Sequence, residues 1–566
     1  MQPQDTIKFE GVEEPSERLG ATEDHSPELD SSKEYHDYPT GIRLGLICLS
    51  LCLSIFLTAL DNTIIATAIP KITDQFQSQG DIGWYGSAYL LTQASLQLLF
   101  GKAYTYGSIK WIFLMAIALF ELGSLVCGVA PNSTALICGR AIAGLGAAGI
   151  SNGAMIIVTY SVPLVKRPMY TGLIGAMYGI ASVVGPILGG VFTDKVTWRW
   201  CFYINLPIGG VAVMLIVIFF TAPQRSAITD MSWGDRLKQF DFLGSLVFMP
   251  AVICVLLALQ WGGTSYPWSN WRNILLLVLF GVLVLCWLLL QYFKGDSATV
   301  PPRLVAQRSV AAALWFNFCM GSFFLILVYY VPIWFQAVKD QSAMGSGIRT
   351  LPFILGLVLV SIIAGIGVTI VGYYAPFMIA SSIVSSIGAG LLMTFRPSTG
   401  HAHWIGYQAI VGIGVGLGLQ QPLVVCQTVL SLDDVPTGTA MMYFVQTFGG
   451  ALFIAVAQNV FQNRLKEELI KTVPDVDPNV VVSTGATSLQ GSVSAQDLPR
   501  VLSAYNAGLT RAFLVATIMA ALTLIGSLAV QWRTIKSTKS EANKPNTDLN
   551  ESVDKDATTA AVGDAP

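Results

Sequence analysis

Stretches of about 20 consecutive apolar residues recur along this chain, and they constrain its fold more than any other feature. Of the 566 residues, 53% are hydrophobic and only 12% are charged, whereas soluble globular proteins carry roughly 25% charged residues. We count fourteen stretches, at about residues 44–67, 84–104, 111–130, 135–158, 170–193, 202–221, 242–261, 273–293, 310–334, 348–370, 373–394, 404–428, 438–460 and 511–532. The predicted fold class is therefore an all-α polytopic membrane protein with fourteen transmembrane helices.

Basic residues near these stretches predict the orientation of the chain. An even number of spans places both termini on the same side of the membrane. The short loops on that side hold ten Lys or Arg residues, and those on the other side hold seven. Arg43, Arg533, Lys536 and Lys539 flank the terminal spans and strengthen this bias. Because basic loops are retained in the cytoplasm, we expect both termini to be cytoplasmic.

The polar segments outside the spans are predicted to be two tails and one long loop. Residues 1–43 are acidic and poor in apolar side chains, so they bury too little surface to offset the entropy of ordering. They lack the basic start and apolar core of a cleavable signal peptide, and the first span is expected to act as its own insertion signal. The tail 533–566 is expected to be disordered too, and 461–510 is expected to be an outer loop that is too polar to span.

Cysteine and histidine usage gives no sign of a cofactor. All nine cysteines lie in or beside apolar stretches, and none forms a Cys-x-x-Cys pair, so neither a disulfide framework nor a zinc site is predicted. The spacing of His401 and His403 would allow a metal ligand pair, but two histidines in a loop are more often incidental. We expect neither metal nor cofactor.

Three charged residues, Asp61, Arg140 and Glu121, lie well inside apolar stretches and away from their ends. Such residues are costly in a bilayer and are usually functional. Asp61 is about six residues from the outer end of the first span and Arg140 about six from the outer start of the fourth, so they lie at nearly the same depth. A change in their separation can bind or release a proton, although a static ion pair would have the same spacing. Glu121, nearer the middle of its span, is predicted to be a second protonatable site or to form an interhelical hydrogen bond.

Glycine-rich motifs accompany these residues. They read GKAYTYGSIKW at 101–111, RAIAGLGAAG at 140–149 and GIASVVGPILGG at 179–190, besides LDNTI at 60–64. On these motifs the chain resembles the major facilitator superfamily, in particular the fourteen-span drug:proton antiporter family and its fungal members that export toxins and drugs. The resemblance covers about residues 40–535.

The resemblance implies a domain organisation and a set of conformational motifs. It implies one six-helix bundle at 44–221, linkers and two extra central spans at 222–309, and a second six-helix bundle at 310–532. The implied conformational motif residues are Gly101, Lys102, Lys110, Gly144, Gly179, Gly185, Pro186, Gly189 and Gly190. The chain departs from the family pattern where Tyr104 or Thr105 replaces an Asp and where Ala143 replaces a Gln, and the glycines would look the same if they served packing alone.

Polar and aromatic residues within the spans are candidates for a substrate cavity. They are Gln93, Asn152, Tyr178, Asn317, Tyr330, Gln420 and Gln421. Transporters built from repeats bind substrate near the midplane between their halves, and an apolar cavity with few polar groups suits hydrophobic organic molecules. The predicted function is proton-coupled export of small hydrophobic organic compounds such as a drug, a toxin or a fungal secondary metabolite.

Several alternatives stay open at this point. The same scaffold would serve uptake or vacuolar transport of basic amino acids or siderophores, and the residues alone would permit Na⁺ as readily as protons. An ATP-driven pump, a channel and a membrane enzyme are disfavoured, because the chain has no phosphate-binding GxxxxGK[ST] loop, no repeated pore loop and no His within its spans. Asn132 lies in a possible N-glycosylation sequon on the outer side. We expect a plasma-membrane protein, with the vacuolar membrane as the alternative, and no obligate protein partner.

Overall fold

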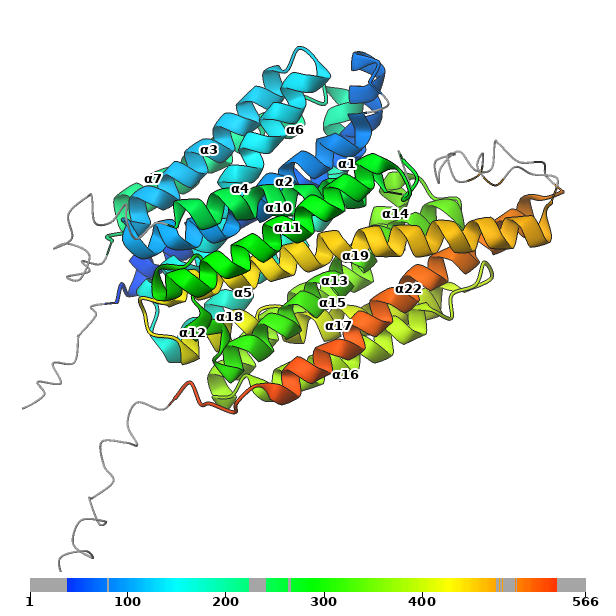
Figure 1. Cartoon of the computed structure of the whole chain (residues 1–566). Coiled ribbons are helices and arrows are strands. Elements are labelled where there is room, and N and C mark those ends of the chain that lie inside the picture. Colours follow the sequence, from blue (N-terminus) through cyan, green and yellow to red (C-terminus); the bar gives the residue numbers. More distant parts are fainter. Residues whose placement is uncertain are drawn as a thin grey trace, which may run out of the picture. The chain divides into compact units, whose positions relative to one another are not determined.

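Helices make up the regular structure of the described part of this chain, for which we analyse a computed structural model (Figure 1). The structure describes residues 38–78, 81–222, 241–262, 266–474, 478, 481, 494 and 496–536. Most of the predicted tails 1–43 and 533–566, and the middle of the predicted loop 461–510, therefore lie outside the described residues.

The helices fall into a first half, a central pair and a second half. The first half contains α1 (Gly41–Phe76), α2 (Ile82–Tyr106), α3 (Ile109–Val129), α4 (Ser133–Ser161), η2 (Leu164–Lys166), α5 (Arg167–Lys195), α6 (Trp200–Tyr203) and α7 (Asn205–Phe219). The central pair is α10 (Phe242–Trp261) and α11 (Trp271–Lys294), followed by η3 (Gly295–Ser297) and α12 (Pro302–Val305). The second half contains α13 (Arg308–Ala337), α14 (Ala343–Arg349), α15 (Leu351–Val371), α16 (Ala375–Leu392), α17 (His401–Gly418), α18 (Gln421–Val429), α19 (Val435–Thr472) and α22 (Leu498–Ala529).

Thirteen helical stretches among the described residues are long and apolar enough to cross a membrane. The predicted span 84–104 is not among these thirteen; it corresponds to α2, whose Tyr, Gln, Ser and Thr residues lower its mean hydropathy. Its 25 residues extend about 38 Å at 1.5 Å per residue, and it packs against α4, α10 and α19. We therefore count α2 as a span, and the prediction of an all-α polytopic membrane protein is confirmed.

Proline and glycine set several helix boundaries. A proline in the first turn begins α5, α15, α16, α18, α19 and α22, where its missing N–H has no intrahelical partner to lose. Helix α15 ends at Gly372, which adopts φ 90°, a left-handed conformation that glycine accepts without steric cost. This sharp ending makes residues 371–374 a tight link between two helices rather than a pore loop.

Some helices differ in length from the apolar stretches that predicted them. Helix α1 continues to Phe76 and α19 to Thr472, beyond the predicted ends at 67 and 460. Each continuation mixes polar and apolar residues, so it stays helical although it no longer counts as an apolar stretch. The predicted span 404–428 is divided into α17 and α18 at Leu419 and Gln420. The predicted outer loop 461–510 accordingly begins and ends with helix.

The central pair lies against both halves. Helix α10 contacts α2 of the first half and α19 of the second; Figure 1 shows the central pair α10 and α11 beside α2. The ring of Phe248 on α10 lies 5.1 Å from that of Phe444 on α19. The two halves also meet directly, through α5 with α15 and α2 with α19. A site enclosed by α1, α2, α5, α13 and α19 is thus built from both halves.

One end of the bundle, here called the terminal end, carries the start of α1 and the end of α22. Arg43 donates to the hydroxyl of Thr221 at 2.7 Å, and Arg308 donates to the carbonyl of Ala529 at 2.8 Å. These bonds tie the first and last spans to their neighbours at the same end.

Candidate functional site

A fully buried ion pair joins α1 to α4. Asp61 and Arg140 are each 0% exposed, and Nη1 of Arg140 donates to Oδ2 of Asp61. Arg140 also donates from Nε to the carbonyl of Tyr85 at 2.8 Å. The two charges compensate each other, which a buried charge requires. The structure thus brings together the two residues for which the sequence predicted equal depth.

Polar groups from α3 and α7 extend this pair. Nδ2 of Asn205 donates to Oδ1 of Asp61 at 3.2 Å and to Oγ of Ser124 at 3.1 Å. Glu121 lies one turn before Ser124 on α3 and faces α7, where a Cβ added at Gly209 would overlap its carboxyl group. Neither oxygen of Glu121 has a hydrogen-bond partner among the described residues. Glu121 therefore has no described interhelical hydrogen bond.

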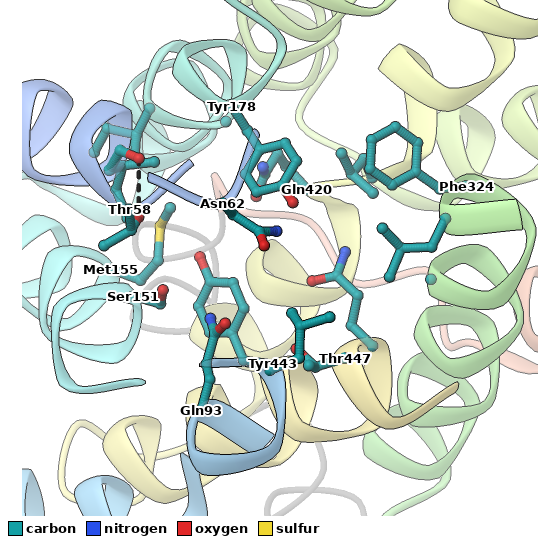
Figure 2. Close-up of a pocket in the computed structure, with 18 of the residues that line it drawn as sticks. Thr58, Asn62, Gln93, Ser151, Met155, Tyr178, Phe324, Gln420, Tyr443 and Thr447 are labelled. Carbon is teal, nitrogen blue, oxygen red and sulfur yellow. Dashed lines mark hydrogen bonds between the residues drawn. The ribbon is translucent and has the colours of Figure 1, made fainter. Parts of the chain in front are cut away.

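A central cavity of about 1010 Å³, including its open mouth, lies between the two halves. The twenty residues around it are uncharged, with carboxamides and phenols set among aliphatic and aromatic side chains. Figure 2 shows Asn62, Gln93, Tyr178 and Gln420 turned towards the same space. The ring of Tyr178 lies 6.2 Å from that of Phe324 across the two halves. Such a lining can hold an amphipathic organic molecule of moderate size.

Three of the seven residues predicted for a substrate cavity line this one, namely Gln93, Tyr178 and Gln420. The other four make hydrogen bonds elsewhere. Asn152 pairs with Gln97 (Nε2 to Oδ1, 2.8 Å), Asn317 with the carbonyl of Met442 (2.7 Å), Tyr330 with Gln458 (2.7 Å) and Gln421 with the carbonyl of Leu417 (3.1 Å). In these four positions the polar group holds backbone or neighbouring helices together.

Sequence reasoning missed several polar members of the lining. They are Thr58, Asn62, Tyr89, Ser151, Tyr443, Gln446 and Thr447. Asn62 follows Asp61 directly, and Gln446 and Thr447 lie on α19 about three turns after its start. Spacing from Asn62 and Gln93 along each helix would have found some of them, but only the mutual rotation of the helices decides which face meets the cavity.

The motif on α5 packs on the motif of α1. A Cβ at Gly185 would overlap Thr63, and a Cβ at Gly189 would lie 2.7 Å from the carbonyl oxygen of Ile64. Oγ1 of Thr63 donates to the carbonyl of Ala181 at 3.1 Å. These two glycines let α5 approach α1 within the stretch that holds Asp61.

The remaining residues of the α5 motif have other surroundings. Gly179 lies against Leu357 of α15, where an added Cβ would be 2.9 Å from Cδ2. A Cβ added at Gly347 in α14 would lie 3.9 Å from Cβ of Pro186, and Gly190 has open space around its Cβ position. One edge of the motif therefore faces the second half.

At the terminal end, the α2 motif meets the start of α19. A Cβ at Gly101 would lie 2.5 Å from Cβ of Ala440 and 3.3 Å from the carbonyl oxygen of Pro436. The hydroxyls of Thr105 and Thr437 are 3.2 Å apart. A neutral hydroxyl pair thus links the two halves at this motif.

The other motif residues contact the first half. Lys102 is 3% exposed, with Nζ 5.8 Å from the ring centre of Tyr106. Lys110 donates to the carbonyls of Val217 and Phe220 at the end of α7. Gly144 on α4 lies against the backbone of Tyr89, where a side chain would overlap the carbonyl oxygen.

A second buried carboxylate holds the central pair together at the terminal end. Asp241 accepts hydrogen bonds from Lys294 (2.7 Å), Gln291 (3.0 Å), Gly244 (2.8 Å) and Thr299 (2.8 Å from the hydroxyl). Burial raises the pKa of a carboxyl, but these bonds more than offset that effect and hold the pKa of Asp241 well below its usual range.

Arg303 lies in α12, in the linker between the central pair and the second half, and joins this linker to the second half. Its guanidinium makes two hydrogen bonds to the carboxylate of Asp434, at 2.8 and 2.6 Å, and a third to Asp296 at 2.7 Å. Burial opposes ionisation of Asp434, but the bonds from Arg303 and Ser431 outweigh it and lower its pKa. Asp434 is the residue before α19, so the linker fixes the start of that helix.

Other predicted features occupy ordinary structural positions. Asn132 caps α4, with its side chain accepting from the N–H of Ala135 at 2.9 Å. The rings of His401 and Trp404 lie 5.7 Å apart. No group of three or more His, Cys, Asp or Glu within the described residues is placed to hold a metal. The nine cysteines are free thiols.

Two helical halves that enclose a cavity beside a buried ion pair define the architecture of a secondary transporter. The sequence model of the Major Facilitator Superfamily matches residues 51–454, and the chain belongs to this superfamily. It is accordingly a multi-pass membrane transporter and not an enzyme.

Named relatives agree with this assignment. The chain is 54% identical to the MFS-type efflux pump MFS1 of Arthroderma benhamiae over 92% of this chain and 97% of that protein. It is 49% identical to the efflux pump aflT of Aspergillus parasiticus over 90% of this chain and all of that protein. Among solved structures, the human organic anion transporter MFSD10 (TETRAN) superposes with a TM-score of 0.56 at 12% identity, covering 86% of this chain and 99% of that one. This last similarity concerns the fold alone.

Proposed function

We propose that this protein exports small, uncharged, largely hydrophobic organic compounds, such as fungal secondary metabolites or drugs, in exchange for protons. The observation that carries the proposal is the buried Asp61–Arg140 pair beside an uncharged cavity built from both halves. The efflux pumps that it resembles at 49–54% identity support the export direction.

The chemistry of the cavity favours neutral substrates over the alternatives. Basic amino acids or anionic siderophores would need opposite charges to replace their hydration shells, whereas the cavity lining is uncharged. Carboxamides such as Asn62, Gln93 and Gln446 offer both donors and acceptors. They suit a compound that carries carbonyl and hydroxyl groups on an apolar skeleton.

The proposed cycle is alternating access. Asp61 takes up a proton when the cavity faces the more acidic side, which weakens its bond to Arg140. It releases the proton when the cavity faces the other side and substrate binds. Each proton moved with the membrane potential supplies about 2.3 kcal/mol per 100 mV. Glu121, without a described partner, is the proposed second proton-binding site.

The proposed orientation puts the terminal end in the cytoplasm. The support for it is the excess of basic residues in the loops at that end. The plasma membrane is the proposed location, since export from the cell requires it.

Transport in reconstituted vesicles tests the function. Vesicles with an acidic lumen should accumulate a neutral lipophilic compound when they contain the wild-type protein, because outward proton flow drives inward substrate movement. Asp61→Asn should reduce the accumulation to the level seen in vesicles without protein. Asp74→Asn makes the same chemical change at an exposed position on the same helix and should leave it unaltered. Accumulation that ignores the pH gradient in the wild type would refute proton coupling.

A further inference from the structure

Tyr89 on α2 lies between the ion pair and the cavity. The guanidinium carbon of Arg140 lies 4.5 Å from the centre of its ring. The same residue lines the cavity, although it is only 1% exposed. One aromatic side chain therefore touches both the cation and the space that holds the substrate.

The ring contributes to the stability of the buried cation. Arg140 hydrogen-bonds to Asp61 through Nη1 and to the carbonyl of Tyr85 through Nε. Its Nη2 has no hydrogen-bond partner among the described residues. The negative face of an aromatic ring attracts a guanidinium, most strongly where water is excluded. Movement of the ring would therefore change the position at which the guanidinium is most stable.

Neighbouring helices hold both the backbone and the hydroxyl of Tyr89. Gly144 lies directly against the carbonyl of Tyr89, and Oγ1 of Thr92 bridges the carbonyls of Tyr89 (3.1 Å) and Ala141 (2.8 Å). Helices α2 and α4 are thus fixed to each other within one turn of Arg140. The side chain is held at its hydroxyl, which donates to the carbonyl of Thr58 at 3.1 Å. Thr58 lies one turn before Asp61 on α1.

From this arrangement we infer that Tyr89 is the positioning residue that transmits occupancy of the cavity to the Asp61–Arg140 pair. A substrate that presses on the ring displaces the guanidinium relative to the carboxylate and so couples substrate binding to proton release. This inference rests on the proposed function. It adds a residue that neither carries the proton nor sets the substrate class.

The test measures protons moved per substrate molecule in vesicles, with a fluorescent pH dye and a radiolabelled neutral compound at zero membrane potential. Tyr89→Phe keeps the ring and should keep the wild-type ratio. Tyr89→Leu removes the ring face and should still exchange substrate across the membrane, but its ratio should fall several-fold. Tyr443→Leu, which alters the cavity from α19, should weaken substrate binding and leave the ratio unchanged.

The outcomes separate the inference from the function beneath it. A wild-type protein that moves no protons with substrate refutes the proposed function and the role of Tyr89 with it. A coupled wild type with an equally coupled Tyr89→Leu variant overturns the role of Tyr89 alone. Gel filtration in detergent shows whether Tyr89→Leu folds. If it does not, Tyr89→Met replaces it, because methionine fills the volume with a flexible apolar chain, and its ratio of protons to substrate tests the role of Tyr89 in the same way.

Discussion

At the scale of the residue, the molecule depends on charges that are buried in pairs. A buried ion pair that loses one partner leaves a charge without compensation, which costs about 3–5 kcal/mol. Asp61 and Arg140 are both fully buried, and Asn205 supplies a further hydrogen bond to the carboxylate. The pair is thus sensitive both as a structural element and as a proposed proton site.

This sensitivity predicts a non-additive mutant pair. Arg140→Met should lower the free energy of unfolding by about 3–5 kcal/mol because it isolates Asp61. Asp61→Asn with Arg140→Met should recover a large part of that loss, since no unpaired charge remains. Thermal unfolding in detergent measures the stability of the single and the double variant. A double variant that loses the sum of the two single losses would contradict the pairing.

The sequence predicted the depth of these residues better than their surroundings. Equal distance from the outer ends of two spans indicated that Asp61 and Arg140 lie at one level. Spacing along a helix does not give the rotation of that helix, so Asn152, which bonds to Gln97, could not be distinguished from Gln93, which lines the cavity. Tyr89 escaped notice because a tyrosine in an apolar span is an ordinary packing residue.

At the scale of the element, close helix contacts rest on small residues. The contact of α2 with α19 at the terminal end depends on Gly101, where a side chain would meet Ala440. Gly101→Val should separate the two helices there, because three extra carbons cannot fit against the backbone of Pro436. We expect increased labelling of a cysteine placed at Thr437 by a water-soluble thiol reagent. Gly190→Val, whose Cβ has open space, is the matched control, and equal labelling in both variants would contradict the account.

The linker carboxylate Asp241 predicts a pH effect on stability. Its pKa is lowered in the folded protein, so its stabilisation is present above the ordinary value of about 3.9 and is lost as the pH falls through the lowered folded value. Asp241→Asn should cost roughly 1.5–3 kcal/mol at neutral pH, because hydrogen bonds to a charged group are lost. The difference in unfolding temperature between wild type and variant should narrow below about pH 4. A constant difference down to pH 2 would contradict this role.

The apolar stretches predicted most elements but not all their bounds. Hydropathy detects where a helix can meet lipid, and it does not detect a helix that continues as an amphipathic segment. Helix α19 therefore runs to Thr472, past the predicted end of its span. The break between α17 and α18 occurs at Gln420, a cavity residue, and the short polar interruption Gln420-Gln421 before Pro422 does not divide the long apolar stretch.

At the scale of the whole molecule, two halves enclose the cavity and touch at the terminal end. The hydroxyls of Thr105 and Thr437 join α2 and α19 there at 3.2 Å. Alternating access requires this contact to open once in each cycle. The hydroxyl pair itself is neutral, and Lys102 of α2 and Asp434 just before α19 add an electrostatic attraction at the same end.

A cross-link across this contact should arrest transport. Thr105→Cys with Thr437→Cys, in a background without the nine native cysteines, should form a disulfide on oxidation and lose substrate transport, and a reductant should restore it. Thr105→Cys alone should be insensitive to oxidation. Full transport by the cross-linked protein would show that the halves need not part at this end.

The central claim is that substrate and protons exchange through Asp61, and proton movement driven by substrate tests it most directly. Vesicles containing the wild-type protein, at equal internal and external pH and zero membrane potential, receive a neutral lipophilic compound outside. The account predicts that inward substrate flow drives protons out and makes the lumen alkaline, and that Asp61→Asn abolishes the change. A lumen that keeps its pH while the wild-type protein carries substrate, or an alkaline shift that persists in Asp61→Asn, would contradict it.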